Sequence, residues 1–398
     1  MPTQLCLRIS VITLIALTRI SAEPVAYPTL NPPAGITPAM TRQWFPWSCG
    51  KPTDSRTLPK QAWTPEQRHA YEKRVEWFHD AKFGLFFHFL AFGEGLNNFP
   101  SVGFQWTSEK WNAWVDAVDV DKVADQAQEL GAGYVIITLG QNHRYACAPN
   151  PVLDKLWQLQ PGQFNSRRDL PMDLYKALAK RNIPMMLYIA ADNQHKLPTP
   201  ASFKGTDARE NWLKVIEWYS DHYGSCCKGW WVDGLRDDFG IKDYRVRLHQ
   251  ALKRGNPDAL VASGHYEISD FVHGHCQYDW NRQQQQVKPY FGRWDPDFKI
   301  QWHTFQFIGH YWAASDTPKK TVDLANYAAA VVKGGGVITF DVGMYRTVDG
   351  TTVGPCLEIQ ENQLEQLRAV REALKDIPPT DGAEMAPVLN GAKKDSEK

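Results

Sequence analysis

The 398-residue sequence has no surplus of charge of either sign, because 44 Lys and Arg residues balance 44 Asp and Glu residues. Nucleic acids and anionic membranes attract proteins with a basic excess, so the composition gives no reason to expect either partner. The sequence also lacks the cysteine spacing of a zinc site, since its seven cysteines are scattered without a Cys-x-x-Cys pair. We therefore expect no nucleic-acid partner, no cofactor and no bound metal.

Long apolar runs are also scarce. One run, residues 9–17, follows Arg8 and is too short to span a bilayer. The small residues Ser21-Ala22 come shortly after it, which is typical of a signal peptide over residues 1–22, with a buried N-terminal helix as the alternative. We expect a secreted or periplasmic protein whose mature chain has no membrane span, whereas the oligomeric state cannot be read from the sequence.

Aromatic residues, by contrast, are abundant: 16 Trp, 15 Tyr and 18 Phe. Most of these rings are expected to fill a large core. Sugar-binding sites often stack pyranose faces on aromatic rings as well, so the count is compatible with a carbohydrate ligand.

The chain divides into four regions by composition. Residues 1–22 are the expected signal peptide, and residues 23–65 form a Pro- and Thr-rich leader with little periodicity. Thr64-Pro65-Glu66 then has the composition of a helix start. We expect one catalytic domain over residues 66–376 and a polar tail over residues 377–398.

Within the domain, short apolar runs alternate with amphipathic stretches. The predicted strands are 83–89, 134–139, 185–190, 229–232, 259–263 and 337–342, and the predicted helices between and after them are 121–130, 171–182, 208–223, 244–254, 322–332 and 360–374. This alternation indicates a parallel sheet covered by helices. The absence of Gly-x-Gly-x-x-Gly after the first strand favours an α/β fold of the (β/α)8 TIM-like barrel type over a Rossmann sheet. Two strands cannot be placed between residues 271 and 311.

Polar side chains follow several of these strands. In a (β/α)8 barrel the functional groups lie at the carboxyl ends of the strands, and here those ends carry His88, Gln141 to Arg144, Tyr188, Asp192, Asp233 and His265 to Glu267. Such a set suits a sugar site, where polar groups bind hydroxyls and two acids cleave the bond. Asp233 directly follows a buried strand, although an Asp before Gly can also simply make a turn.

A metal site is the alternative for the histidines. His88 and His143 with Asp192 and Asp233 could in principle bind zinc. The sequence has no His-x-Glu or His-x-x-x-His spacing at these positions, so we keep this hypothesis as the minor one.

Several motifs resemble one family in order along the chain. Trp77 to Phe89 (WFHDAKFGLFFHF) resembles the W-F-x-x-A-K-F-G-I-F-x-H-W segment of the α-L-fucosidases, glycoside hydrolase family 29. Further similar segments are Phe104 to Trp106, Val118 to Leu139, Asn142-His143, Met185 to Tyr188, Trp231 to Gly234, Gln301 to Thr304 and Lys333 to Gly343. Each motif is short, but their shared order from about Trp77 to Leu374 is specific.

The resemblance implies a barrel enzyme that retains anomeric configuration, with Asp233 as nucleophile. It implies that the sugar is held by His88, Gln105, Trp106, Asn142, His143, Tyr188 and Trp302. Retention needs a second carboxyl group roughly 5–5.5 Å from the first. Glu267 and Asp279 are the two alternatives for this acid/base, and Glu267 is slightly preferred because it follows a readable strand.

The sequence also departs from the family pattern. Gln105 stands at a usual Glu, Asn142 at a usual His, and Arg144 where Asp is common; an Arg after the fifth strand and the C-terminal β-sandwich are not evident. These changes affect sugar recognition more than the nucleophile. The first hypothesis is therefore a glycosidase for α-L-fucosides or a related sugar on an oligosaccharide or glycoconjugate. The second is an inactive carbohydrate-binding barrel or a glycosidase of shifted specificity, and the third is a metal-dependent hydrolase.

Overall fold

The structure is a computed structural model. It describes residues 63–91, 106–141, 144–192, 197–235, 238–264, 268–274, 292–295, 298–309, 312–348 and 351–381. The predicted signal peptide, nearly all of the leader and most of the tail lie outside these residues. No helix among the residues described is long and apolar enough to cross a membrane.

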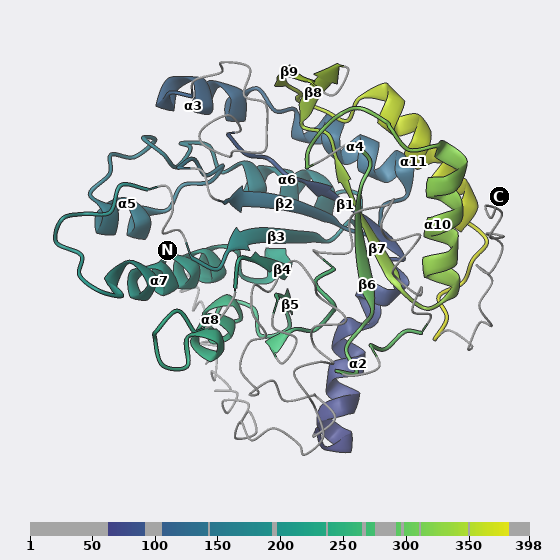
Figure 1. The fold of residues 1–398 in the computed structure, drawn as a ribbon, viewed down its shortest axis with the longest axis horizontal. Coiled ribbons are helices and arrows are strands. Elements are labelled where there is room, and N and C mark those ends of the chain that lie inside the picture. Colours follow the sequence, from purple (N-terminus) through teal and green to yellow (C-terminus); the bar gives the residue numbers. More distant parts are fainter. Residues whose placement is uncertain are drawn as a thin grey trace, which may run out of the picture.

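A curled sheet of parallel strands forms the centre of the domain (Figure 1). Its strands are β1 (Phe83–Phe87), β2 (Val135–Gly140), β3 (Met185–Ala190), β4 (Cys227–Asp233), β5 (Leu260–Ala262), β6 (His303–Phe307) and β7 (Val337–Val342). The order is β5-β4-β3-β2-β1-β7-β6, and every neighbouring pair is parallel. The predicted α/β architecture of the TIM-like type is confirmed, with seven strands in the parallel sheet that the described residues form. β6 is one of the two strands that the sequence reading could not place.

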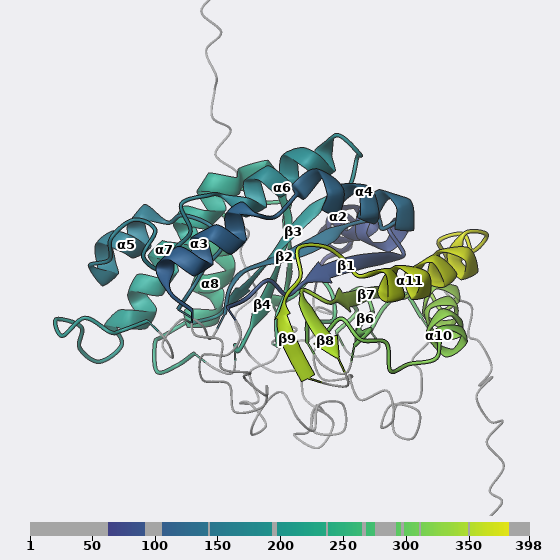
Figure 2. The same cartoon turned by 90° about the horizontal axis from the view of Figure 1, so that it is seen from above.

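Helices surround the outside of this sheet (Figures 1 and 2). They are α2 (Pro65–Asp80), α3 (Ser108–Asp116), α4 (Val120–Leu130), α5 (Pro151–Trp157), α6 (Leu170–Ala179), α7 (Asp207–Tyr223), α8 (Tyr244–Leu252), α10 (Thr321–Lys333) and α11 (Glu361–Leu374). α2 begins where the sequence predicted, because Thr64 and Gln67 form a capping box in front of Pro65. An antiparallel hairpin, β8 (Tyr345–Val348) and β9 (Thr351–Pro355), follows β7.

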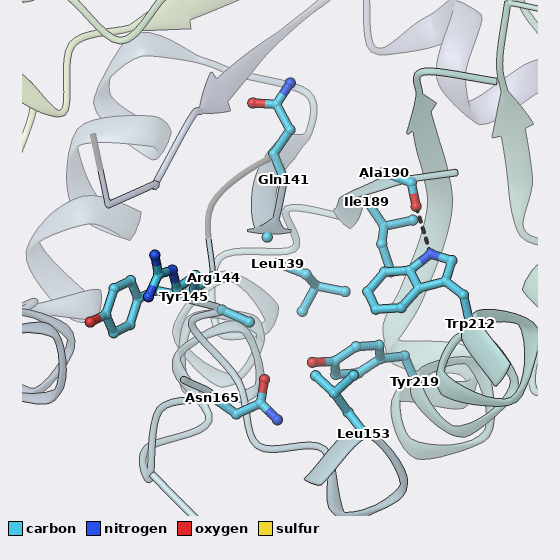
Figure 3. Close-up of a pocket in the computed structure, with 12 residues that line it drawn as sticks. Leu139, Gln141, Arg144, Tyr145, Leu153, Asn165, Ile189, Ala190, Trp212 and Tyr219 are labelled. Atoms are coloured by element: carbon cyan, nitrogen blue, oxygen red, sulfur yellow. Dashed lines mark hydrogen bonds between the residues drawn. The ribbon is translucent and has the colours of Figure 1, made fainter. Parts of the chain in front are cut away.

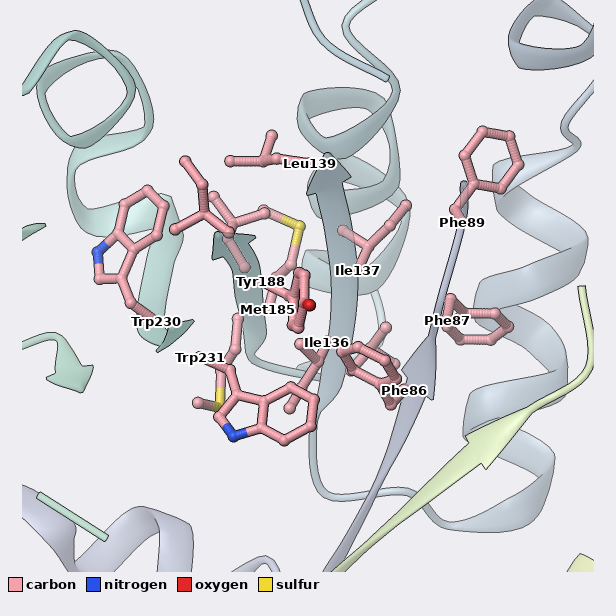
Figure 4. Packing of buried hydrophobic residues seen from close by; sticks show 14 of the residues in the cluster. Phe86, Phe87, Phe89, Ile136, Ile137, Leu139, Met185, Tyr188, Trp230 and Trp231 are labelled. Atoms are coloured by element: carbon pink, nitrogen blue, oxygen red, sulfur yellow. The ribbon is translucent and has the colours of Figure 1, made fainter. Parts of the chain in front are cut away.

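Aromatic rings fill the inside of the curled sheet. Phe86 points toward Trp231 and Tyr188, whereas its neighbour Phe87 points to the other side of β1 (Figure 4). The Trp231 ring stacks on Phe305 with 4.9 Å between centroids and meets Phe86 edge-on at 5.0 Å. Each such pair adds roughly 0.5–1.5 kcal/mol beyond the burial of its area. The strands are thus held at a spacing that these rings define.

A chain of hydrogen bonds crosses the interior near the end of the sheet at which the strands begin. The Tyr134 hydroxyl lies 2.7 Å from Thr339 Oγ1, which lies 2.7 Å from His303 Nε2, and His303 Nδ1 lies 2.9 Å from the Val272 carbonyl. Burial lowers the pKa of His303 to about 3, so the ring is neutral. Because the carbonyl can only accept, His303 Nδ1 donates, Nε2 accepts from Thr339, and Thr339 accepts from Tyr134. All three side chains are satisfied by this single arrangement.

Asp270 joins β5 to two helices. Its Oδ2 accepts from Val261 N at 2.9 Å and from Lys253 Nζ at 3.0 Å, and its Oδ1 accepts from Arg74 Nη2 at 2.6 Å. The Asp270 side chain is 2% exposed. Lys253 follows α8 and Arg74 belongs to α2, so one buried carboxylate ties both helices to the short strand β5.

We expect Asp270→Ala to lower the free energy of unfolding by about 3–5 kcal/mol, the usual loss when one partner of a buried ion pair is removed. The reason is that the buried ammonium of Lys253 and the Val261 N–H would lose their acceptor. Urea unfolding followed by tryptophan fluorescence measures the loss. Asp116→Ala, at an exposed acid in α3, serves as the control; equal midpoints for the two variants would contradict the role of Asp270.

Candidate active site

Asp233 is the last residue of β4, and three donors hold its carboxylate. Tyr188 OH donates to Oδ2 at 2.6 Å, Gln141 Nε2 donates to the same oxygen at 2.7 Å, and Gly234 N donates to Oδ1 at 2.7 Å. Gly234 has φ +75°, a left-handed conformation that suits glycine. The chain therefore turns immediately after Asp233, and the carboxylate is fixed between the ends of β2, β3 and β4.

Tyr188 keeps its proton under all ordinary conditions. Its ring is fully buried on β3, and burial together with the negative charge of Asp233 raises the pKa of the phenol well above its usual value. The hydroxyl is therefore a permanent donor to the carboxylate. A donor to an ionised acceptor forms a bond roughly twice as strong as one between neutral groups.

His88 lies beside Tyr188, just beyond β1. The two rings meet edge-on at 5.3 Å, and His88 Nδ1 lies 3.2 Å from Thr138 Oγ1 on β2. The His88 ring also packs against Trp312, with 4.9 Å between centroids. The structure thus brings the predicted residues His88, Tyr188 and Asp233 to one end of the sheet.

Trp302 and Trp106 are two further predicted sugar contacts. Trp302 directly precedes β6, at the end of the strands remote from Asp233, and a Cβ on Gly336 would come within 2.1 Å of its ring. The Trp302 motif thus falls at the start of its strand, where the ring fills the space over Gly336, and its contact with the sugar stays a prediction. Trp106 is buried against Trp111 and Trp114. Its place next to the sugar stays a prediction.

The remaining predicted residues lie outside the described part of the chain: Gln105, Asn142, His143, Glu267 and Asp279. Their roles as sugar contacts and as acid/base stay predictions.

The sequence did not identify Gln141 as a partner of Asp233. Gln141 stood out only as one of several polar residues after the second strand. The sequence feature that could have identified Gln141 is its position as the first polar side chain after β2.

Asp341 and Trp312 were missed as well. Asp341 pairs in register with Phe86 and is 1% exposed, and burial raises the pKa of its carboxyl group well above the usual value. Its Oδ2 accepts from Ala313 N at 2.5 Å, and Ala313 has φ +55°. Asp341 therefore fixes the left-handed turn that places the neighbouring Trp312 against His88.

A small cavity lies behind the site, between the outer face of β2 and β3 and helices α5 and α7 (Figure 3). Leu139 and Ile189 line it from the sheet, and Tyr219 lines it from α7. The Tyr219 hydroxyl and Asn165 Oδ1 are buried and have no hydrogen-bond partner among the described residues. The cavity also reaches Gln141, so it adjoins the support of Asp233.

We expect Tyr219→Phe to cost clearly less stability than Tyr134→Phe, although both rings are buried. The Tyr219 hydroxyl has no hydrogen-bond partner within bonding distance among the described residues, whereas removing the Tyr134 hydroxyl breaks a bond worth roughly 0.5–1.5 kcal/mol and leaves Thr339 short of a donor. Parallel denaturant titrations of the two variants test this ranking. A larger loss for Tyr219→Phe would contradict it.

Comparison with known proteins finds similar sequences among the α-L-fucosidases, although no family model matches the chain. Tissue α-L-fucosidase of Homo sapiens is 28% identical over 157 residues, which are 33% of this chain and 33% of that protein. The Bos taurus enzyme is 27% identical over 222 residues, which are 49% of this chain and 40% of that protein. The matches thus span two fifths or less of the length of these curated relatives.

Solved structures share the fold. α-L-fucosidase isoenzyme 1 from Paenibacillus thiaminolyticus superimposes with a TM-score of 0.56 and 16% identity, covering 80% of each chain. The endo-fucoidan hydrolase MfFcnA4 of glycoside hydrolase family 107 also gives 0.56, with 15% identity over 76% of this chain and 54% of its own. In its sequence matches this chain is similar to the tissue α-L-fucosidases, and it shares the fold of a bacterial α-L-fucosidase.

Proposed function

We propose that the chain is a retaining glycosidase that hydrolyses α-L-fucosides or a closely related sugar, with Asp233 as nucleophile. The observation that carries the proposal is the Asp233 carboxylate at the end of β4, held by Tyr188 and Gln141. The names of the relatives, which are tissue α-L-fucosidases and an endo-fucoidan hydrolase, supply the class of sugar. His88 lies beside Tyr188, the partner of the carboxylate, and Trp312 packs against His88, so the two supply polar and aromatic contact surface.

The proposed reaction has two displacements. An Asp233 oxygen attacks the anomeric carbon and the glycosidic C–O bond breaks, while the acid/base, Glu267 or Asp279, gives its proton to the leaving oxygen. In the second displacement the acid/base, now ionised, takes a proton from water, and that water attacks the anomeric carbon. The C–O bond to Asp233 breaks and the nucleophile returns as a free carboxylate.

Tyr188 and Gln141 act differently in the two steps. Their hydrogen bonds stabilise the ionised carboxylate, so they orient the nucleophile but give no net help as its charge disappears in the first step. In the second step the carboxylate is the leaving group and its charge returns. The same two donors then stabilise the developing charge and favour release of the sugar.

Asp233→Asn is expected to lower hydrolysis of an aryl α-L-fucoside by at least about a thousand-fold, because the amide is a far weaker nucleophile. Asp192→Asn is the matched control, since Asp192 follows the neighbouring strand β3 and its carboxylate pairs with Arg209 at 3.3 Å. Initial rates from released aryl alcohol, on a panel of glycosides, make the measurement.

Azide distinguishes a nucleophile from a structural acid. Asp233→Gly leaves room for azide to attack the anomeric carbon, so added azide should restore release of the aryl alcohol and yield a fucosyl azide.

Unchanged hydrolysis by Asp233→Asn would overturn the proposed mechanism. Sugar binding without turnover in the wild-type chain would favour the carbohydrate-binding barrel instead, and activity on another glycoside alone would indicate shifted specificity.

Tyr188→Phe is expected to lower kcat by about 10- to 100-fold on an activated aryl substrate, for which release of the sugar limits the rate. Loss of a hydrogen bond to a charged group, roughly 1.5–3 kcal/mol, gives this range. kcat/KM reports the first step and should fall less. Tyr134→Phe, the same change at the remote end of the strands, should leave both parameters near wild type; equal effects of the two substitutions would exclude a direct role for Tyr188.

We also propose that residues 1–22 direct export, so that the mature protein is secreted or periplasmic, with residues 23–65 as its leader, residues 66–376 as the catalytic domain and residues 377–398 as its tail. The arginine followed by a short apolar run and small residues supports the signal peptide. N-terminal sequencing of the protein recovered from its natural compartment would locate the cleavage.

A further inference from the structure

The last turn of α2 gathers three groups that could bind a metal ion. Glu76, His79 and Asp80 place one ligand atom each within 4.8 Å of the others. α2 ends just before β1, so these residues lie at the end of the strands remote from Asp233. The proposed hydrolysis uses none of them.

His79 is the group that distinguishes this cluster from an ordinary acidic surface. Its side chain is 5% exposed, whereas those of Glu76 and Asp80 are 51% and 54% exposed. Its Nε2 lies 3.0 Å from the Thr380 carbonyl, which can only accept, so Nε2 carries a hydrogen. Its Nδ1 is buried and has no hydrogen-bond partner in the part of the chain that the structure describes.

The unpartnered nitrogen faces the carboxylates. Asp80 Oδ1 is 3.7 Å from His79 Nδ1, which is beyond hydrogen-bond range. With the proton on Nε2, the Nδ1 lone pair and the carboxylate oxygens are all electron-pair donors, and no proton lies between them. A cation placed among the three would satisfy all of them.

We propose that Glu76, His79 and Asp80 form a binding site for a divalent transition-metal ion of the zinc type. One imidazole with two carboxylates is a normal set of protein ligands for such an ion, and water can complete a tetrahedron. Zn–N and Zn–O bonds of about 2.0 Å place ligand atoms about 3.3 Å apart. The ligand atoms now lie within 4.8 Å of one another, and small side-chain rotations of the two exposed carboxylates would bring them to that distance.

The bond from His79 Nε2 to Thr380 is the usual support of a metal-binding histidine. Histidine ligands commonly donate their second ring N–H to a carbonyl or carboxylate, which fixes the tautomer and the ring orientation. Here the acceptor belongs to the segment after α11. Metal binding would therefore strengthen the attachment of that segment to α2.

Arg293 limits the affinity of the site. Its Nη2 lies 2.6 Å from Glu76 Oε2, and its Nη1 lies 3.0 Å from Asp381 Oδ1. The guanidinium repels a cation, but the three carboxylates of Glu76, Asp80 and Asp381 leave a net charge of −2 around neutral His79. We expect a dissociation constant for Zn2+ in the micromolar range rather than that of a closed four-ligand site.

The test uses the full chain after treatment with a chelator and its removal. Competition with a chromogenic zinc indicator gives the number and affinity of sites, and thermal unfolding gives the effect on the fold. Wild type should bind one equivalent of Zn2+ that His79→Gln does not bind. At free Zn2+ a hundred times the dissociation constant, the ratio of folded to unfolded wild type should rise about a hundred-fold.

Two further variants keep the result interpretable. His69→Gln changes an exposed histidine of the same helix, and this variant should still bind one equivalent of Zn2+. Asp80→Asn removes a ligand at an exposed position, so it should weaken binding at least ten-fold while its unfolding temperature without zinc stays near wild type. Equal zinc binding by wild type, His79→Gln and Asp80→Asn would overturn the proposal, as would the absence of any bound equivalent in wild type.

Discussion

The packing of aromatic rings inside the curled sheet is the constraint on which the rest of the structure depends. Phe86, Trp231 and Phe305 come from three different strands and meet in one layer, with centroids 4.9–5.4 Å apart. Interiors are close-packed, so the size of these rings sets the distances between strands. Tyr188 touches the same layer through Trp231 at 5.3 Å. The donor that holds Asp233 is thus positioned by the core itself.

The sheet also explains why the sequence revealed so much of this fold. β1, β2, β3 and β7 are almost wholly apolar because both faces of each strand are buried, and such runs can be recognised without a structure. The same reasoning located His88, Tyr188 and Asp233, since a polar residue at the end of an apolar strand must lie where the strands end.

What the sequence concealed depends on partners that are distant along the chain. β6 reads His-Thr-Phe-Gln-Phe, which looks like a surface segment, but His303 is buried because Thr339 and the Val272 carbonyl satisfy its ring. Gln141 belongs to the site only because β4 brings Asp233 within 2.7 Å of it. For Trp302 the matching motif gave the residue type, whereas only the structure shows that it stands just before the start of β6.

The bond between Asp341 and Ala313 has a consequence for how such a barrel can change during evolution. Asp341 holds the backbone nitrogen of Ala313 and not the side chain of Trp312. The loop can therefore keep its shape while the residue at position 312 is exchanged for another. Neutral drift at that position would alter the surface next to His88 without loosening the anchor, so in the proposed glycosidase the sugar contact could diverge among descendants that all preserve the same turn.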